Sequence, residues 1–221
     1  SKPLKNPVND ARLIDATLTE LGFKVERIED ATLDDMRYAA RTFLKKSQDA
    51  DIALFYYAGH AAQVRGNNYL APIDGKIVYE DELESRGLNI TEEVVARLDR
   101  RGKQGQLSIV VLDACRDNPF QTRTRNMARG LSDSAVKPEG LLLAFSTRPG
   151  DTALDSPDFR NSRYTAHLVE AMRIPGLEVR DVFARVLDAI TGETRGGKFT
   201  QTPWFHSSVS SSNFCFVHTR N

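Results

Sequence analysis

Short apolar runs alternate along the chain with longer segments in which apolar residues recur at helical spacing. Residues 52–57 (IALFYY) and 107–112 (LSIVVL) are almost continuously apolar, which is typical of strands that are covered on both faces. Further strands are predicted at 23–28, 141–145 and 214–217. The pattern predicts an α/β fold, with a mainly parallel sheet and helices on both of its faces.

Amphipathic segments between these runs predict the helices. Residues 11–22 space leucine and isoleucine at helical intervals and stop at Gly22, which suits a helix C-terminus. Similar spacing predicts helices at 33–47, 92–101, 162–172 and 179–193.

Length and composition fit a single domain over residues 1–221. Thirty basic and thirty acidic residues cancel, so no global field attracts nucleic acid or an anionic membrane, and neither is expected as a partner. No apolar run approaches the roughly 18 residues of a membrane span. Two cysteines, Cys115 and Cys215, make no disulfide scaffold. A cytoplasmic location is favoured, while export stays open because the natural N-terminus is not visible in the sequence.

Two of the predicted strands run into reactive side chains. The run IALFYYAGH leads to His60, and LSIVVLDAC ends at Cys115. Parallel sheets bind ligands outside the carboxyl ends of their strands, so neighbouring strands would bring the thiol and the imidazole together. Taken singly, each residue reads as structural, either a small buried thiol or a core histidine. Taken together, they predict a nucleophilic Cys-His pair, because a nearby base raises the small thiolate fraction of a free cysteine.

Four ordered segments give the chain a family resemblance. They are LKNPVNDARLIDATLTELGF, FYYAGHAAQVRGNNYLAPID, IVVLDACRDNPF and PWFHSSVSSSNFCF. Together they resemble the bacterial caspase-like peptidases, from the clan of caspases, metacaspases, orthocaspases and paracaspases. The separation of His60 and Cys115 is also close to the roughly 50 residues typical of caspases. The resemblance implies a caspase-like fold with a six-stranded sheet, and a thiol protease activity.

The resemblance implies roles for three residues. Cys115 would be the nucleophile, and His60 the base that activates it and later protonates the leaving amine. The backbone N–H groups of Cys115 and of Ala61 would form the oxyanion hole. Relatives usually carry glycine at the position of Ala61, so this alanine would be strained if the backbone there needs a positive φ.

The resemblance also implies a pocket for P1, the residue before the scissile bond. Asp113 and Asp10 match the acids with which metacaspase-like and paracaspase enzymes bind arginine or lysine, and Asp151 is a third, lower-ranked lining residue. Carboxylates favour arginine through charge-assisted bonds to its guanidinium. From the residues alone, Asp10 reads equally well as a helix N-terminal acid, and Asp113 reads as a strand-end carboxylate bound by backbone donors.

One strand of the implied fold is unaccounted for. Relatives begin with a strand that lies between the two strands predicted here at 23–28 and 52–57. We expect a separate cleaved chain, or residues upstream of Ser1, to supply it. Losing an interior strand would otherwise cost about as much as the ~5–15 kcal/mol stability of a domain.

A polar segment at 121–140 carries Arg123, Arg125 and Arg129 between the nucleophile strand and the next one. Caspases are cut in this region during activation, so an enzyme that cleaves after arginine could process itself there or before Ser1.

No metal or cofactor is expected. Calcium dependence, known in some metacaspase relatives, stays open, although an acidic cluster at residues 74–84 reads as a solvated face. The cluster comprises Asp74, Glu80, Asp81, Glu82 and Glu84.

Two alternatives to an endopeptidase stay open. One is a caspase-like module without catalysis that serves assembly or signalling, and Ala61 favours it. The other is a hydrolase of small esters or amides that uses the same Cys-His pair. Asp10 and Asp113 favour the endopeptidase, because a pocket for a basic P1 residue needs acids.

Overall fold

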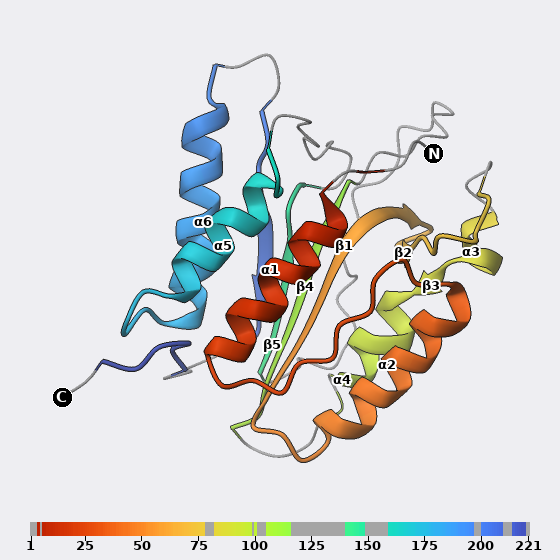
Figure 1. Cartoon of the computed structure of the whole chain (residues 1–221), viewed down its shortest axis with the longest axis horizontal. Coiled ribbons are helices and arrows are strands. Elements are labelled where there is room, and N and C mark those ends of the chain that lie inside the picture. The colour runs from red at the N-terminus through yellow and green to blue at the C-terminus, as the bar shows by residue number, and fades with distance from the viewer. Residues whose placement is uncertain are drawn as a thin grey trace.

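In a computed structural model of the chain, six strands of the described residues form one sheet (Figure 1). The model describes residues 4, 6–77, 82–98, 100, 105–115, 140–148, 159–196, 200–209 and 214–219, except the side chain of Cys115. The strands are β1 (Ile52–Val64), β2 (Asn67–Leu70), β3 (Leu88–Asn89), β4 (Leu107–Cys115), β5 (Leu141–Phe145) and β6 (Trp204–Ser207). Their order is β3-β2-β1-β4-β5-β6. The central strands β1, β4 and β5 are parallel, and β2, β3 and β6 add antiparallel pairs. The predicted α/β fold is confirmed.

Alternate residues of β4 enter two hydrophobic cores. Ile109 and Val111 pack with α1 (Pro7–Glu20), α5 (Arg163–Met172) and α6 (Val179–Thr194). Val110 and Leu112 pack on the other face with α2 (Leu33–Ser47), η1 (Thr91–Val95) and α4 (Ala96–Leu98). In Figure 1, α5 and α6 lie on the side of the sheet away from α2. The continuous apolar run of β4 follows from this burial on both faces.

Local capping explains where the helices begin. Pro7 stands in the first turn of α1, where no intrahelical hydrogen bond is lost. α2 begins with a capping box, in which Thr32 and Asp35 each bind the other's backbone N–H. Asp74 adds to this cap, because its carboxylate accepts a hydrogen bond from the N–H of Leu33 at 3.1 Å. A further short helix, α3 (Glu82–Arg86), precedes β3.

The structure corrects two strand boundaries. The strand predicted at 52–57 continues to Val64, and Arg65 and Gly66, both with positive φ, turn the chain into β2. In place of a strand at 214–217 there is one isolated bridge between Glu178 and Cys215. This run is apolar because its phenylalanines pack into the core beside α6, and not because it pairs in the sheet. β6, which the sequence pattern did not predict, takes the edge position.

A third correction concerns residues 23–28, which form no strand in the described sheet. β1 pairs with β4 through residues 52–60 and with β2 only through residues 61–64. Within the described part of the chain, no strand pairs with the edge of residues 52–59 opposite β4. A strand needs a hydrogen-bonding neighbour, and the described sheet offers none here. Phe23 and Val25 are half-buried against the core, whereas residues 24 and 26–28 are exposed.

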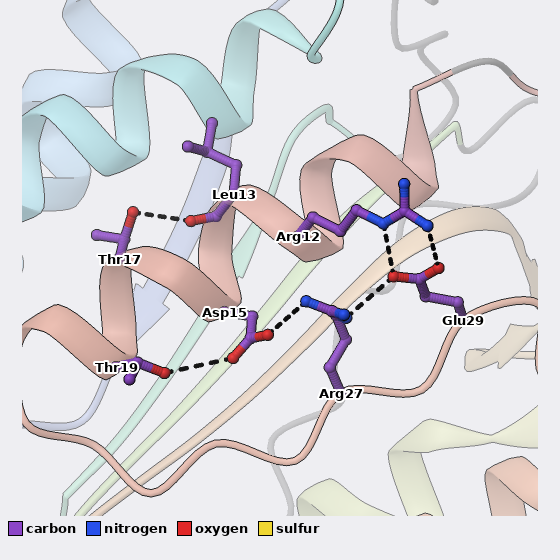
Figure 2. Close-up of polar contacts among 7 residues, drawn as sticks. All are labelled: Arg12, Leu13, Asp15, Thr17, Thr19, Arg27 and Glu29. Carbon is purple, nitrogen blue, oxygen red and sulfur yellow. Dashed lines mark hydrogen bonds and ion pairs between the residues drawn. The ribbon is translucent and has the colours of Figure 1, made fainter.

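An ion-pair cluster joins this segment to α1 (Figure 2). Arg12 donates to both carboxylate oxygens of Glu29, at 2.8 and 2.7 Å. Arg27 contacts Asp15 on α1 and also Glu29, at 3.0 Å. The hydrogen bond from Arg12 lowers the pKa of Glu29 below its ordinary value, and Arg27 adds to this effect. Glu29 is therefore ionised at neutral pH. Its ion pairs connect the segment that contains Arg27 and Glu29 to α1, beside which this segment runs in Figure 2.

Candidate active site

β1 and β4 bring His60 and Cys115 to opposite positions on neighbouring strands. The two residues are Cα partners at the end of a parallel ladder that begins at Ile52 and Leu107. Neighbouring strands lie about 4.7–4.9 Å apart, which is within the reach of an imidazole and a thiol. The side chain of Cys115 lies outside the described residues. The backbones thus meet as the sequence predicted, and the catalytic roles of the two residues stay a prediction.

His60 lies inside β1, which corrects the prediction that it follows the end of the strand. The strand continues because residues 61–64 pair with β2. The Tyr57 hydroxyl stabilises this hairpin, because the carbonyl oxygens of His60, at 2.8 Å, and of Ala71, at 3.1 Å, both lie within reach of its one proton. Gly59 makes room for that hydroxyl. Its φ is +153°, and a Cβ atom there would lie 2.5 Å from the Tyr57 oxygen, so the position before His60 requires glycine.

Ala61 does not need the conformational freedom of glycine. The described non-glycine residues with a positive φ are Asp30, Arg65 and Lys76, so the φ of Ala61 is negative and the strain considered from the sequence does not arise. Its methyl group lies in the core, with 9% of the residue exposed.

The N–H of Ala61 has a defined direction. The carbonyl of His60 accepts a hydrogen bond from the N–H of Ala71, on the β2 side of β1, at 2.9 Å. The described chain has no cis peptide bond, so the N–H of Ala61 points to the opposite edge of β1. That edge faces β4, the strand that ends at Cys115.

Asp10 and Asp113 meet at the N-terminus of α5. Asp10 comes from α1 and is 2% exposed, and Asp113 comes from β4 and is 7% exposed. Oδ1 of Asp10 accepts hydrogen bonds from the side chain of Asn161 and from the N–H of Ser162, both at 2.9 Å. Oδ2 of Asp113 accepts from the Ser162 hydroxyl and from the Thr165 hydroxyl, the latter at 2.7 Å. The structure therefore brings the two acids of the predicted P1 pocket to one place.

The negative charge of these acids affects the pKa values of two buried tyrosines. Burial raises the pKa of Tyr56 and of Tyr164 well above the ordinary value, and the negative charge of Asp113 raises both pKa values further. Asp10 contributes in the same direction to the pKa of Tyr56. Both phenols are neutral at physiological pH and leave the negative charge of the site on the carboxylates.

A sequence profile of the peptidase C14 caspase domain matches residues 1–214. The chain belongs to the caspase family. The caspase domain agrees with the resemblance found in the sequence.

Individual relatives place this caspase domain in context. Mucosa-associated lymphoid tissue lymphoma translocation protein 1 of Homo sapiens is 32% identical over 113 residues, and its homologue from Mus musculus is 31% identical over 113 residues. Each match covers 51% of this chain and only 13% of the relative's length. The crystal structure of Caspase-1 from Spodoptera frugiperda has a TM-score of 0.63 and 18% identity, over 98% of this chain and 83% of that one. The fold is thus caspase-like. The bacterial, metacaspase and orthocaspase groupings stay predictions.

Several predicted site residues of this caspase domain lie outside the described residues. They are Asp151, Arg123, Arg125 and Arg129, together with Glu80 and Asp81 of the acidic cluster. Of the remaining acids in that cluster, Asp74 caps α2, and Glu82 and Glu84 lie beside Arg86 and Arg65. Among the residues that are described, no group of three or more His, Cys, Asp or Glu could hold a metal ion. Calcium dependence therefore stays open.

Sequence reasoning missed the residues that hold the two acids. Asn161, Ser162 and Thr165 lie just before or in the first turn of α5, and Ser162 is its N-cap. The signal was present, because a serine directly before an amphipathic run is a common helix start. What the sequence does not reveal is that this helix start faces two carboxylates from distant segments.

In addition, no helix in the described ranges is long and apolar enough to cross a membrane.

Proposed function

We propose that this caspase domain is a cysteine endopeptidase that cleaves protein and peptide substrates after arginine or lysine. The observation that carries the proposal is that Asp10 and Asp113 meet at the N-terminus of α5. Asp113 lies on β4, two residues before Cys115. Both acids are buried, and Ser162 contacts both of them. A cationic P1 side chain would complement this charge.

The proposed reaction has two steps. His60 takes the proton from the Cys115 thiol, and the thiolate attacks the carbonyl carbon of the P1 residue. The imidazolium then gives its proton to the leaving amine as the peptide C–N bond breaks, which leaves a thioester. In the second step His60 takes a proton from water, and the resulting hydroxide attacks the thioester. The C–S bond breaks, the imidazolium returns its proton to the thiolate, and the new carboxylic acid loses its proton to solvent.

Two backbone N–H groups would stabilise the oxyanion of each tetrahedral intermediate. The first belongs to Cys115, and the second to Ala61. The register of β1 and β4 places both N–H groups between the two strands, so the oxyanion would have to replace their ladder partners. The negative φ of Ala61 supports this assignment, because the added methyl group causes no backbone strain. Removing one donor of such a hole typically costs about 2.7–4 kcal/mol of transition-state stabilisation.

The first test is a panel of otherwise identical peptides with arginine, lysine or aspartate at P1. We expect hydrolysis after arginine and lysine, and about 10²-fold less after aspartate, because two buried carboxylates repel an acidic P1 residue. The panel is run with calcium and with a chelator, which also determines whether activity depends on calcium. Hydrolysis only after aspartate would contradict the acidic pocket. No hydrolysis after any residue would favour a non-catalytic module.

Self-cleavage is part of the same proposal. An enzyme with this preference could cut after Arg123, Arg125 or Arg129, or before Ser1. The support is the position of these arginines between β4 and β5, directly after the strand of Cys115.

We also propose that a β-strand from residues upstream of Ser1, on the same or a cleaved chain, pairs with the edge of β1 opposite β4. The support is the contrast between two similar apolar strands. Residues 107–114 of β4 are all buried, whereas residues 54–60 of β1 are only half-buried. Residues 23–28, with a strand-like sequence, lie in the same region without a pairing partner.

Extending the chain with its native upstream residues should raise its thermal midpoint by about 10 °C, because several backbone groups gain partners at about 1–3 kcal/mol each. Hydrogen exchange should slow in residues 52–59 and 23–28. The amides of β5 serve as the internal control, since that strand is already paired on both edges. Unchanged exchange along β1 would contradict the added strand.

A further inference from the structure

Ser162 contacts both acids of the proposed P1 pocket. Its backbone N–H donates to Oδ1 of Asp10 at 2.9 Å, and its hydroxyl donates to Oδ2 of Asp113. The same hydroxyl oxygen accepts a hydrogen bond from the N–H of Thr165 at 2.9 Å, which caps α5. One residue thus ties together a carboxylate from α1, a carboxylate from β4 and the first turn of α5.

The hydroxyl protons around Asp113 can be assigned in order. A hydroxyl carries one proton, and that of Thr165 is directed to Asp113 at 2.7 Å. The Tyr56 hydroxyl, 2.6 Å from the Thr165 oxygen, is therefore the donor in that pair. A chain of donors runs from Tyr56 through Thr165 to Asp113, and Ser162 supplies the second hydroxyl on the same carboxylate oxygen. Each donor orients the charged form of Asp113.

We propose that Ser162 is a positioning residue that sets the specificity for arginine over lysine. The inference rests on the proposed function, and it concerns which basic side chain the pocket prefers. A guanidinium forms a planar fork that bonds two acceptors at fixed positions, whereas an ammonium is a point charge that tolerates their displacement. By holding Asp10 through its backbone and Asp113 through its hydroxyl, Ser162 fixes the relative position of the two carboxylates.

The test compares Ser162→Ala with Ser162→Thr on peptides with arginine or lysine at P1. Ser162→Ala keeps the N–H that binds Asp10 but loses the hydroxyl that binds Asp113 and caps α5. We expect KM for the arginine peptide to rise about tenfold, with a smaller change for lysine, so that the arginine-to-lysine ratio of kcat/KM falls about fivefold. Ser162→Thr keeps a hydroxyl and should restore most of that ratio.

The matched control is Thr32→Ala, which removes the N-cap of α2 on the opposite face of the sheet. It should lower the thermal midpoint about as much as Ser162→Ala, because losing an N-cap side chain has a similar effect on any helix. It should not change the arginine-to-lysine ratio. Should Ser162→Ala fail to fold, Thr165→Val removes the other hydroxyl donor to Asp113 and should shift the ratio in the same direction.

A binding measurement separates this inference from the proposed function. Calorimetry on Cys115→Ala, with and without Ser162→Ala, follows acetyl-arginine amide and acetyl-lysine amide without catalysis. We expect Ser162→Ala to weaken the arginine ligand more than the lysine ligand. If the wild-type protein cleaves after arginine but Ser162→Ala leaves both the ratio and the binding unchanged, only the positioning role is wrong. If neither basic ligand binds and neither peptide is cleaved, the acidic pocket itself is wrong.

Discussion

Replacing Cys115 by alanine will reduce the cleavage of arginyl peptides to background, and replacing His60 by alanine will lower kcat by about 10³-fold or more. The first variant removes the atom that forms the thioester. The second leaves the thiol without a base and the leaving amine without an acid. Because the two side chains act as one unit, the double variant should be no slower than Cys115→Ala alone. Steady-state rates on the arginine peptide measure all three variants.

Matched controls come from the same chain. Cys215→Ala removes the free, half-buried cysteine beside α6, and His218→Ala removes an exposed histidine close to it. Neither should change kcat/KM. Mass spectrometry of the same proteins tests self-cleavage, since Cys115→Ala should keep intact the segment that contains Arg123, Arg125 and Arg129. Identical termini in active and inactive protein would rule out self-cleavage, and full activity of Cys115→Ala would rule out the nucleophile.

The parallel centre of the sheet was predictable because burial on both faces leaves a continuous apolar run. β4 shows this clearly, since its alternate residues enter different cores. Residues 214–217 carry a similar run, and residues 23–28 alternate apolar with charged positions, but neither segment forms a strand, because apolar residues can contact the core without sheet pairing. Pairing depends on a neighbour distant in sequence. In contrast, β6 pairs with β5 even though its residues, WFHS, lack a long apolar run.

The site was predictable where a residue follows directly from a strand. Cys115 and His60 stand in register because the ladder of β1 and β4 is unbroken, and Asp113 lies two residues before Cys115 on the same strand. The conformation of Ala61 was not predictable, because its φ depends on the hairpin that β1 forms with β2. Ser162 could be read as a helix start, but its contacts join segments about 50 and 150 residues away. Such contacts leave no local pattern.

Asp113→Asn will lower kcat/KM for the arginine peptide by about 10²–10³-fold, mainly through KM, because it leaves a buried guanidinium facing a neutral amide. The substitution preserves shape, and the amide oxygen can still accept from Ser162 and Thr165, so the N-terminus of α5 should keep its structure. A peptide with citrulline at P1, which is neutral and close to arginine in shape, should be cleaved almost equally by both proteins. Asp10→Asn should show the same pattern.

The competing interpretation is that the two acids serve only to hold α5. In that case Asp113→Asn would lower the thermal midpoint and leave the preference for arginine over citrulline unchanged. Glu178→Gln is the control, because Glu178 also has a carboxylate bound at a helix start, here by the backbone N–H of Arg180 at 2.9 Å, but that helix is α6. It should affect stability alone. A preference that falls with Asp113→Asn and not with Glu178→Gln would assign the charge of Asp113 to substrate binding. Both residues bind groups at a helix start, but only Asp113 is proposed to recognise P1.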